Sequence, residues 1–492
     1  MPNPLLCVTV TAPTMAALRE ERDRVADADL VELRLDTVRD PDVAGALEGR
    51  RRPVIVTCRA GWEGGGFLGA EEERRRLLGQ ARDQGAEYVD IEWKAGFDDL
   101  IARAAGKRIV LSSHHFSHVP PDLGDLTRAM RATGAEVIKI AAKVNSLGDC
   151  LPLLELGAQR PNGSQRAVFI AMGEAGLSSR VLAGRFGSAW TYAGAIRDVG
   201  QVSADELLGQ YRFRAIGPST AVYGLAGSPI GHSVSPAMHN AAFAAERLDA
   251  VYLPLPATDA ADFMRFAGAI GLQGASVTIP FKVSLFGHVS EVDEIARRIG
   301  AINTLRLSGD RWLGRNTDAQ GFLEPLLARG VPLVGRRASI LGAGGSARSV
   351  AVALATEGAD VTVHGRDPAK AARMADAVGA RVGDWPPPSG TWDLLVNCTP
   401  IGMHPRVDES PVPHTSLGGG LVYDLVYNPS VTRLLREAAA AGAQTIGGLD
   451  MLVAQAGAQF EWWTGRRPMA GIMRAAALKR LSEFKSDEDH VV

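Results

Sequence analysis

One lysine in the first half of the chain lies in a setting that suits covalent chemistry. Lys139 is within the apolar run EVIKIAA (136–142), which is typical of a buried β-strand. Burial disfavours the charged form of a lysine and lowers its pKa, so that the neutral amine can attack a ketone. A lysine near a strand end can also carry its charge out to water, and this structural role stays open. Lys143 is a competing amine, but it follows the apolar part of the run.

Other side chains of reactive types stand near the ends of neighbouring apolar runs. They are Glu32, Arg34, Arg59, His114, Arg180 and Gln201. A histidine there can act as an acid or a base near neutral pH, although the pair HH at 114–115 is also explained by strand-end polarity. These residues contain no cluster with metal-ligand spacing, so we expect no metal.

Eight apolar, β-branched runs alternate with segments long enough for helices. The runs span 5–10, 29–35, 53–59, 88–93, 108–114, 136–142, 167–172 and 188–193. They do not alternate strictly between apolar and polar residues, which is typical of strands covered on both faces. Eight such units in residues 1–215 predict a compact (β/α)8 barrel, whose strands carry the chemistry at their carboxyl ends.

Residues 5–205 resemble the type I 3-dehydroquinate dehydratases. The matching pieces are VELRLD, TCRAGWEGG, SSHHF, VIKIAA, MGEAGLSSR, RFGSAWTYA and the closing GQ. The resemblance implies that Lys139 forms an imine with the substrate ketone, that His114 is the general acid and base, and that Glu63 orients His114. It also implies that Arg180 clamps the substrate carboxylate. The full set of substrate-binding side chains that it implies is Glu32, Arg34, Arg59, Arg180, Arg197 and Gln201.

Two positions depart from the pattern of that family. Its members commonly have serine where this chain has Arg197, and Asp or Asn where it has His115. Arg197 either contacts the substrate carboxylate or points away from it. Neither change removes a group that the reaction needs, so we expect dehydratase activity with altered substrate binding.

The second half contains four motifs suited to a hydroxylated carboxylate substrate. GSPIGHSVSP places Ser233 and Ser235 two residues apart, so that both hydroxyls face one way in an extended loop. The motifs ASVTIPFK, GAINT and GRNTD contribute Thr278 and Lys282, Asn303, and Asn316 and Asp318. Each motif alone is more often plain surface polarity, but their order just before a nucleotide-binding pattern makes them specific.

That nucleotide-binding pattern begins near residue 338. ASILGAGGSARSVAVALATEG is typical of a strand, a glycine-rich turn and a helix, and DVTVHGR of the next strand. Glycines allow the tight turn and let backbone N–H groups approach a pyrophosphate at the helix N-terminus. We expect a substrate lobe at 219–325 with C-terminal helices at 461–485, and a Rossmann nucleotide lobe at 326–460, which makes the whole chain α/β.

Residues 222–480 resemble the shikimate dehydrogenases. The resemblance implies that Lys282 and Asp318 are the catalytic pair, in which Lys282 supplies or relays the proton and Asp318 orients it. It implies substrate contacts from Ser233, Ser235, Thr278, Asn303, Tyr427 and Gln455. It implies cofactor contacts from the glycine turn, the next strand end, NCTPIGM and GGLDML: Gly342, Ala343, Gly344, Gly345, Ser346, Ala347, Gly365, Arg366, Asp367, Thr399 and Gly448.

Charges at the end of DVTVHGRD favour NADP over NAD. An NAD enzyme would place an acid there for the ribose hydroxyls, whereas Arg366 can stack on adenine or pair with a 2′-phosphate. Asp367 stands where threonine is common in the family and would repel that phosphate unless turned away. Use of both nucleotides therefore stays open.

The two resemblances name consecutive reactions, because the product of the first is the substrate of the second. We therefore expect a bifunctional shikimate-pathway enzyme that acts on 3-dehydroquinate, 3-dehydroshikimate and shikimate. One alternative is a catabolic quinate/shikimate dehydrogenase fusion. The other is a regulator with an inactive barrel, which would lack a reactive lysine and add a basic DNA-binding segment, neither of which is the case in this sequence.

Composition bounds the partners and the compartment. A formal net charge of -2 gives no reason to expect nucleic acid or an anionic membrane as partner. The four cysteines form no CxxC pair, and no signal peptide or long apolar run is evident, so a reducing, cytoplasmic location is expected. The oligomeric state stays open.

Overall fold

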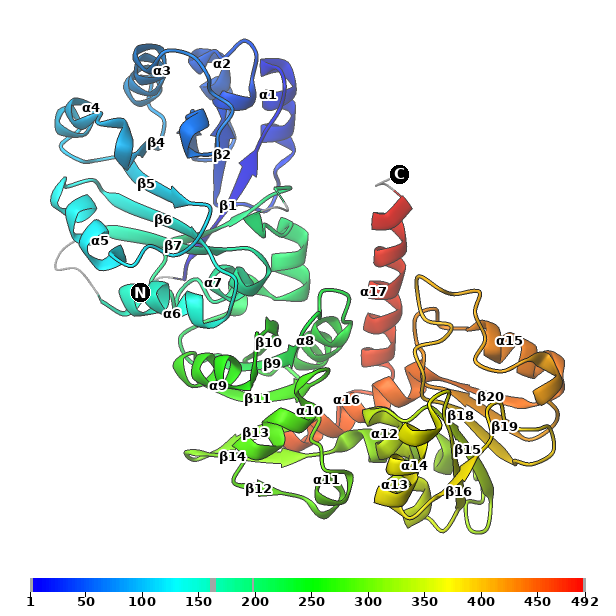
Figure 1. The fold of residues 1–492 in the computed structure, drawn as a ribbon. Helices are drawn as coiled ribbons and strands as arrows, with labels where there is room; N and C mark the ends of the chain where they lie inside the picture. The colour runs from blue at the N-terminus through cyan, green and yellow to red at the C-terminus, as the bar shows by residue number, and fades with distance from the viewer. Residues whose placement is uncertain (1–2, 160–164, 197–198, 490–492) are drawn as a thin grey trace. The chain divides into compact units, whose positions relative to one another are not determined.

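A computed structural model describes residues 3–159, 165–196 and 199–489 of the chain, with side chains as far as residue 484. The chain divides into two compact units, residues 1–222 with 249–271 and residues 223–248 with 272–492. Figure 1 shows the order of the elements along the chain.

The first unit is built on eight parallel strands in the order β7-β6-β5-β4-β3-β2-β1-β8. The strands are β1 (Leu5–Val10), β2 (Leu30–Arg34), β3 (Val54–Thr57), β4 (Tyr88–Glu92), β5 (Ile109–His115), β6 (Val137–Lys143), β7 (Arg166–Met172) and β8 (Trp190–Ala193). The helices between them are α1 (Met15–Arg24), α2 (Val43–Leu47), α3 (Glu71–Asp83), α4 (Asp98–Arg103), α5 (Leu123–Ala132), α6 (Leu151–Ala158) and α7 (Leu177–Val181).

The ring of strands is nearly closed between β7 and β8. An isolated parallel bridge joins Ala167 to Ser188, and the Ala189 N–H donates to the Ala167 carbonyl at 2.7 Å. The predicted (β/α)8 barrel is therefore confirmed, with strand ends at most two residues from those expected. Because every strand runs the same way, the carboxyl ends of all eight meet at one mouth of the barrel.

A second sheet has the order β10-β9-β11-β13-β14-β12. Its strands are β9 (Ala221–Gly227), β10 (Ala250–Pro256), β11 (Leu272–Val277), β12 (Glu291–Val292), β13 (Thr304–Ser308) and β14 (Arg311–Arg315). The helices in this stretch are α8 (Ser235–Ala245), α9 (Ala260–Ala269), α10 (Phe281–Ser284) and α11 (Glu294–Ile299). Strand β13 pairs antiparallel with both β11 and β14.

A third sheet is wholly parallel, in the order β17-β16-β15-β18-β19-β20. Its strands are β15 (Arg337–Leu341), β16 (Asp360–His364), β17 (Arg381–Gly383), β18 (Leu394–Asn397), β19 (Leu421–Asp424) and β20 (Gln444–Gly447). The helices are α12 (Thr317–Ala328), α13 (Gly345–Thr356), α14 (Pro368–Val378), α15 (Arg433–Ala440), α16 (Gly448–Thr464) and α17 (Ile472–Asp489). Strand order reverses between β15 and β18, and such a switch point opens a crevice at the carboxyl ends of the strands.

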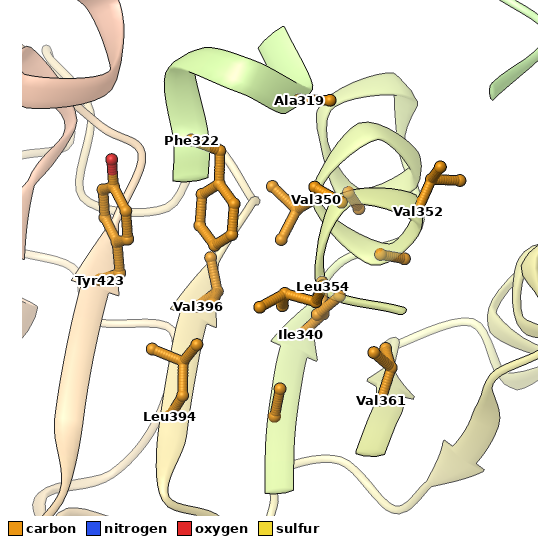
Figure 2. Packing of buried hydrophobic residues seen from close by; sticks show 14 of the residues in the cluster. Ala319, Phe322, Ile340, Val350, Val352, Leu354, Val361, Leu394, Val396 and Tyr423 are labelled. Carbon is orange, nitrogen blue, oxygen red and sulfur yellow. The ribbon is translucent and has the colours of Figure 1, made fainter. Parts of the chain in front are cut away.

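The packed core around the third sheet holds the sides of this crevice in place. Figure 2 shows Val350 and Leu354 of α13 packed over Ile340 of β15, with Val396 and Tyr423 on the neighbouring strands β18 and β19. Each of these side chains is fully buried, and each aliphatic one stabilises the fold by about 1.5–3 kcal/mol. The packing fixes the N-terminus of α13 and the ends of β18 and β19 against one another.

The predicted limits of the two lobes fall inside helices. The limit at 325/326 lies within α12, and the limit at 460/461 lies within α16. These two helices pack closely against each other, so they join the lobes rather than separate them. The lobe limits therefore stay a prediction from sequence.

Candidate active sites

A cavity of about 620 Å³ lies at the carboxyl ends of the barrel strands. It brings together eight of the side chains that sequence reasoning selected: Glu32, Arg34, Arg59, Glu63, His114, Lys139, Arg180 and Gln201. Apolar residues such as Ile170, Met172 and Val199 line the rest of the cavity. A concave, partly apolar site with a few convergent polar groups is typical of small-molecule binding. Arg197 lies outside the described residues.

Lys139 is buried near the middle of β6, with 4% of its surface exposed. Its Nζ atom lies 3.1 Å from Oδ2 of Asp90 and 3.5 Å from Oε1 of Glu32, and 4.3 Å from the centre of the Tyr192 ring. Sequence reasoning considered burial alone, whereas the structure places two carboxylates beside the amine. Lys143, the competing amine, ends β6 and is not among the residues that line the cavity.

Asp90 links the lysine to a second cavity residue. Its fully buried carboxylate accepts hydrogen bonds from Arg59 Nη2 at 2.8 Å and from the Ser112 hydroxyl at 2.6 Å. Burial opposes ionisation, but Arg59, Lys139 and Ser112 outweigh it and lower the pKa of Asp90 to about 2. Sequence reasoning missed Asp90, although its two-residue spacing from Glu92 in the run YVDIE is the signal that both acids face the barrel interior.

His114 and Glu63 form a second pair in the same cavity. Glu63 Oε1 lies 2.9 Å from both the backbone nitrogen and Nδ1 of His114. Burial raises the pKa of Glu63 to about 7, although Arg59 opposes the rise. Burial and the charges of Arg59 and Lys139 hold the pKa of His114 well below its usual value. The imidazole is therefore neutral near pH 7, and with its proton on Nδ1 it presents Nε2 as a base.

Arg180 is a buried cation that pairs with no carboxylate in the described part of the chain. It is 2% exposed and donates to the backbone carbonyls of Tyr192 at 3.3 Å and Val199 at 2.8 Å. Burial lowers the pKa of Arg180 to about 10, and its Nε atom has no protein partner among the described residues. A buried guanidinium in this state is suited to a carboxylate ligand.

His115 is one of the two positions that depart from the family pattern. Its Nε2 atom lies 3.0 Å from the Ser113 hydroxyl.

The second reactive pair consists of Lys282 on α10 and Asp318 in the first turn of α12. Lys282 Nζ lies 2.5 Å from Asp318 Oδ2, and both side chains are mostly buried. Asn303 donates to the other carboxylate oxygen at 2.8 Å. Asn316 caps α12 by accepting the Asp318 N–H at 3.1 Å, which fixes the carboxylate at the start of the helix.

Gln459 on α16 supports this pair and was not predicted. Its Nε2 donates to the backbone carbonyl of Asn303 at 3.3 Å and to Thr304 Oγ1 at 3.1 Å, and its Oε1 accepts from the Ser276 hydroxyl at 2.7 Å. It is 1% exposed, so its amide is removed from bulk solvent. Its spacing of four residues from the predicted Gln455 places both amides on one face of α16.

The remaining predicted substrate residues come from separate elements. Ser235 is the first residue of α8 and its N–H donates to Ser233 Oγ at 3.2 Å, so the predicted extended loop at this point is wrong. The hydroxyls are fixed by a helix start rather than by strand alternation. Thr278 directly follows β11, and Tyr427 follows β19, where burial raises its pKa. Gln455 lies on α16 and donates to the Leu452 carbonyl at 2.9 Å.

A second cavity, of about 720 Å³, lies at the switch point of the third sheet. Its lining includes seven of the predicted cofactor residues: Gly342, Ala343, Gly344, Gly365, Arg366, Asp367 and Thr399. Gly345, Ser346 and Ala347 form the first turn of α13, and Gly448 begins α16; these four do not line the cavity. Gly342 has a φ of +107° beside Thr399, so a larger residue would be strained at this turn.

The charged residues of this cavity include one aspartate and two cations, Arg366 and Lys370. Asp367 accepts the Lys370 N–H at 3.0 Å and caps α14, so its carboxylate is engaged by the helix. Lys370 and Trp385, which sequence reasoning missed, line the cavity together with Arg366. Two cations and an indole beside a glycine turn fit an adenosine that carries a 2′-phosphate.

Neither a metal centre nor a membrane span is found within the described ranges. No three His, Cys, Asp or Glu side chains gather there in a group that could hold a metal ion. No helix of those ranges is both long and apolar enough to cross a membrane.

Comparisons with known proteins cover both halves. The type I 3-dehydroquinase family matches residues 6–218, the shikimate dehydrogenase substrate binding domain matches 225–305, and the shikimate 5′-dehydrogenase C-terminal domain matches 448–478. The chloroplastic bifunctional 3-dehydroquinate dehydratase/shikimate dehydrogenase of Arabidopsis thaliana is 34% identical, over 94% of this chain and 82% of its own length.

Two further relatives match the second half. The NADP(+) shikimate dehydrogenase of Symbiobacterium thermophilum is 42% identical, over 53% of this chain and 94% of its own. A crystal structure of a shikimate dehydrogenase in complex with NADP+ is 34% identical and superposes with a TM-score of 0.52, over 54% of this chain and 97% of its own. With one relative aligned across both halves, the chain belongs to the bifunctional 3-dehydroquinate dehydratase/shikimate dehydrogenase family.

Proposed function

We propose that the two sites carry out consecutive reactions of the shikimate pathway, as the names of the relatives imply. The barrel dehydrates 3-dehydroquinate to 3-dehydroshikimate, and the second half reduces 3-dehydroshikimate to shikimate. The observation that carries this proposal is the presence of a separate lysine in each half, each with its own acidic partner: Lys139 with Asp90, and Lys282 with Asp318.

In the barrel, Lys139 attacks the C3 ketone, and the resulting carbinolamine loses the ketone oxygen as water to form an imine. The protonated imine draws electrons from C2, so His114 can remove the C2 proton through Nε2. The same histidine then gives a proton to the departing C1 hydroxyl, and hydrolysis of the imine releases 3-dehydroshikimate. Glu63 holds the imidazole through Nδ1, and Arg180 pairs with the substrate carboxylate.

In the second half, Lys282 gives a proton to the C3 oxygen as the ketone becomes an alcohol. Asp318 orients the ammonium at 2.5 Å and is itself held by Asn303. NADPH, when bound, supplies the hydride to C3. Ser233 and Ser235, at the start of α8, bind the substrate carboxylate, and Thr278, Tyr427 and Gln455 surround its hydroxyls.

The charges of the nucleotide cavity support a preference for NADPH over NADH. Arg366 and Lys370 both line its adenosine end, where they attract the 2′-phosphate. Asp367 Oδ1 caps α14 by accepting the Lys370 N–H, which favours a structural role for this carboxylate over that of the ribose-binding acid of an NAD enzyme. The glycine turn, which lines the cavity and leads into the N-terminus of α13, holds the pyrophosphate.

The compartment is a further part of this proposal. All four cysteines are free thiols, three of them buried, which supports a reducing compartment such as the cytoplasm.

Covalent trapping tests the dehydratase half. Protein incubated with 3-dehydroshikimate and borohydride should gain the mass of the reduced adduct on the peptide that contains Lys139. Lys143→Ala should be trapped equally, whereas Lys139→Ala should not; an adduct on any other lysine would contradict the assignment. For the other half, reduction of 3-dehydroshikimate should be faster with NADPH than with NADH at equal concentration, and the reverse order would contradict the cofactor assignment.

A further inference from the structure

Asp424, the last residue of β19, is a buried carboxylate that none of the proposed catalytic steps uses. It is fully buried and accepts three hydrogen bonds. Oδ1 accepts from Asn397 Nδ2 at 2.9 Å and from the Val426 N–H at 3.0 Å. Oδ2 accepts from the Thr432 hydroxyl at 2.6 Å. No charged side chain of the described residues pairs with it, and a buried charge without a counter-ion is costly, so this arrangement needs an explanation beyond packing.

The bond from Asn397 fixes the loop that lines the nucleotide cavity. Because a carboxylate only accepts, the amide of Asn397 must turn its NH2 toward Asp424 and its oxygen toward the loop. That oxygen accepts from the Thr399 N–H at 3.0 Å and from the Thr399 hydroxyl at 2.7 Å. Thr399 Oγ1 in turn accepts the Ile401 N–H at 3.2 Å. The orientation of one amide thus sets the course of residues 398–401, three of which line the cavity.

The bond to Val426 fixes a second loop. Residues 425–432 leave the end of β19 and include Tyr427, the proposed substrate contact. The Val426 N–H is bound by the same oxygen of Asp424 that receives Asn397 Nδ2. Val396 and Tyr423 directly precede Asn397 and Asp424, and Figure 2 shows both of them in the packed core. This packing holds the ends of both strands in place.

We propose that Asp424 is a positioning residue for the dinucleotide, which ties the cavity loop 398–401 to the Tyr427 loop and thereby shapes the site between cofactor and substrate. This inference rests on the proposed NADP site. Without the charge, Oδ1 accepts less strongly from Asn397 Nδ2 and from the Val426 N–H, so the Asn397 amide and the cavity loop that it holds through Thr399 are less firmly fixed.

The protonation of Asp424 gives the inference a pH signature. Burial raises its pKa to about 6, against the lowering effect of the bonds from Thr432, Val426 and Asn397. Its strand neighbours, Asn397 on β18 and Gly447 on β20, carry no charge. A titratable group near it is the Cys398 thiol, whose pKa is raised by burial and by the Asp424 charge. The ionised form, whose oxygens accept hydrogen bonds more strongly than those of the neutral acid, is therefore lost as the pH falls through about 6.

The test compares Asp424→Asn with Thr432→Val in the full chain, using NADP+ as the probe. The asparagine keeps the size of the side chain but is neutral. Its NH2 group replaces one of the two carboxylate oxygens, either Oδ2, which accepts from Thr432, or Oδ1, which Asn397 and Val426 share. The valine removes the Thr432 bond and the cap of α15 but leaves the bond between Asp424 and Asn397 in place. Dehydratase activity of the same preparations checks that the barrel is intact.

At pH 8, Asp424→Asn should raise the dissociation constant for NADP+ and the KM for NADPH by about tenfold, the usual effect of losing a hydrogen bond to a charged group. Thr432→Val should lower thermal stability and change NADP+ binding less than about twofold. The ratio of the NADP+ dissociation constant of Asp424→Asn to that of the unaltered chain should fall toward one below pH 6, because Asp424 itself is then neutral. Titration of the 2′-phosphate is common to both proteins and cancels in this ratio.

Three results would overturn the inference. Equal NADP+ affinity in Asp424→Asn and the unaltered chain would show that the carboxylate does not position the site. Equal weakening in Thr432→Val would assign the effect to general loss of stability. A ratio independent of pH would remove the role of the charge. Failure of the unaltered chain to bind NADP+ at all is the distinct outcome that contradicts the proposed function, and the inference with it.

Discussion

Replacement of Glu63 by glutamine should make the barrel more stable and less active at the same time. Glu63 bonds to His114 through one carboxylate oxygen, and burial raises its pKa from 4.5 to about 7. At about 1.4 kcal/mol per pH unit, this rise corresponds to a cost of about 3 kcal/mol for holding the ionised carboxylate in the folded barrel. The cost is absent below pH 4.5, where the folded and unfolded chains are both protonated, and it is complete above pH 7.

The sign of the stability change follows from that pH range. Glu63→Gln has no carboxylate to ionise, so its stability relative to the unaltered chain should increase by up to about 3 kcal/mol between pH 4.5 and pH 8. Urea unfolding at both pH values, followed by tryptophan fluorescence, measures the change. If the difference in unfolding free energy between the two proteins is the same at both pH values, the environment described for Glu63 is contradicted.

Activity should change in the opposite direction. The ionised carboxylate stabilises the imidazolium that forms when His114 takes the C2 proton, so the dehydratase rate should fall as the pH drops below about 7. Because the pKa of His114 lies well below its usual value, His114 does not change its charge in this range. We therefore assign the fall in rate to protonation of Glu63. Glu63→Gln should lose about 10- to 100-fold in rate at pH 8 and show a flat profile between pH 6 and 9. Persistence of the acid-side fall in the variant would refute the assignment, and NADPH-dependent reduction by the same preparations is the control.

Three other substitutions test separate contacts. Arg180→Lys keeps the charge but loses the bidentate fork, so the KM for 3-dehydroquinate should rise by about tenfold or more, and an unchanged KM in steady-state assays would remove Arg180 from substrate binding. Asp367→Ala removes the cap of α14 and should cost about 1 kcal/mol of stability in thermal unfolding, without raising the KM for NADPH; a raised KM would mean that the carboxylate itself contacts the cofactor. Lys282→Met should lower the reductase kcat by about 100-fold or more, with the KM for NADPH changed less than about twofold, and retention of the rate would show that another group supplies the proton.

The barrel and its cavity could be predicted from sequence because their signals are local. Eight apolar runs gave the strands, and reactive side chains at the strand ends gave the cavity, since parallel strands bring these ends together. Asp90 could not be assigned in the same way. Its role depends on the register that sets β4 beside β5 and on a lysine 49 positions away in the sequence.

The second half was predicted less completely, for a related reason. The glycine turn and the Lys282–Asp318 pair lie in recognisable motifs, but Gln459 acts through bonds to Ser276 and Thr304, which only the folded chain brings within reach. Two local features also escaped prediction: α8 begins at Ser235 where an extended loop was expected, and Asp367 caps α14. Sequence spacing does not decide either case, because the side chain of each can serve either a helix terminus or a ligand.

A two-step assay with two variants tests the central claim, that one chain performs both reactions at separate lysines. Purified protein is given 3-dehydroquinate while the enone absorbance of 3-dehydroshikimate is followed, and NADPH is then added while its oxidation is followed. The account predicts that absorbance rises and is then consumed, that Lys139→Ala stops only the first step, and that Lys282→Ala stops only the second. If absorbance never rises while supplied 3-dehydroshikimate is reduced, the barrel is not a dehydratase and the account is contradicted.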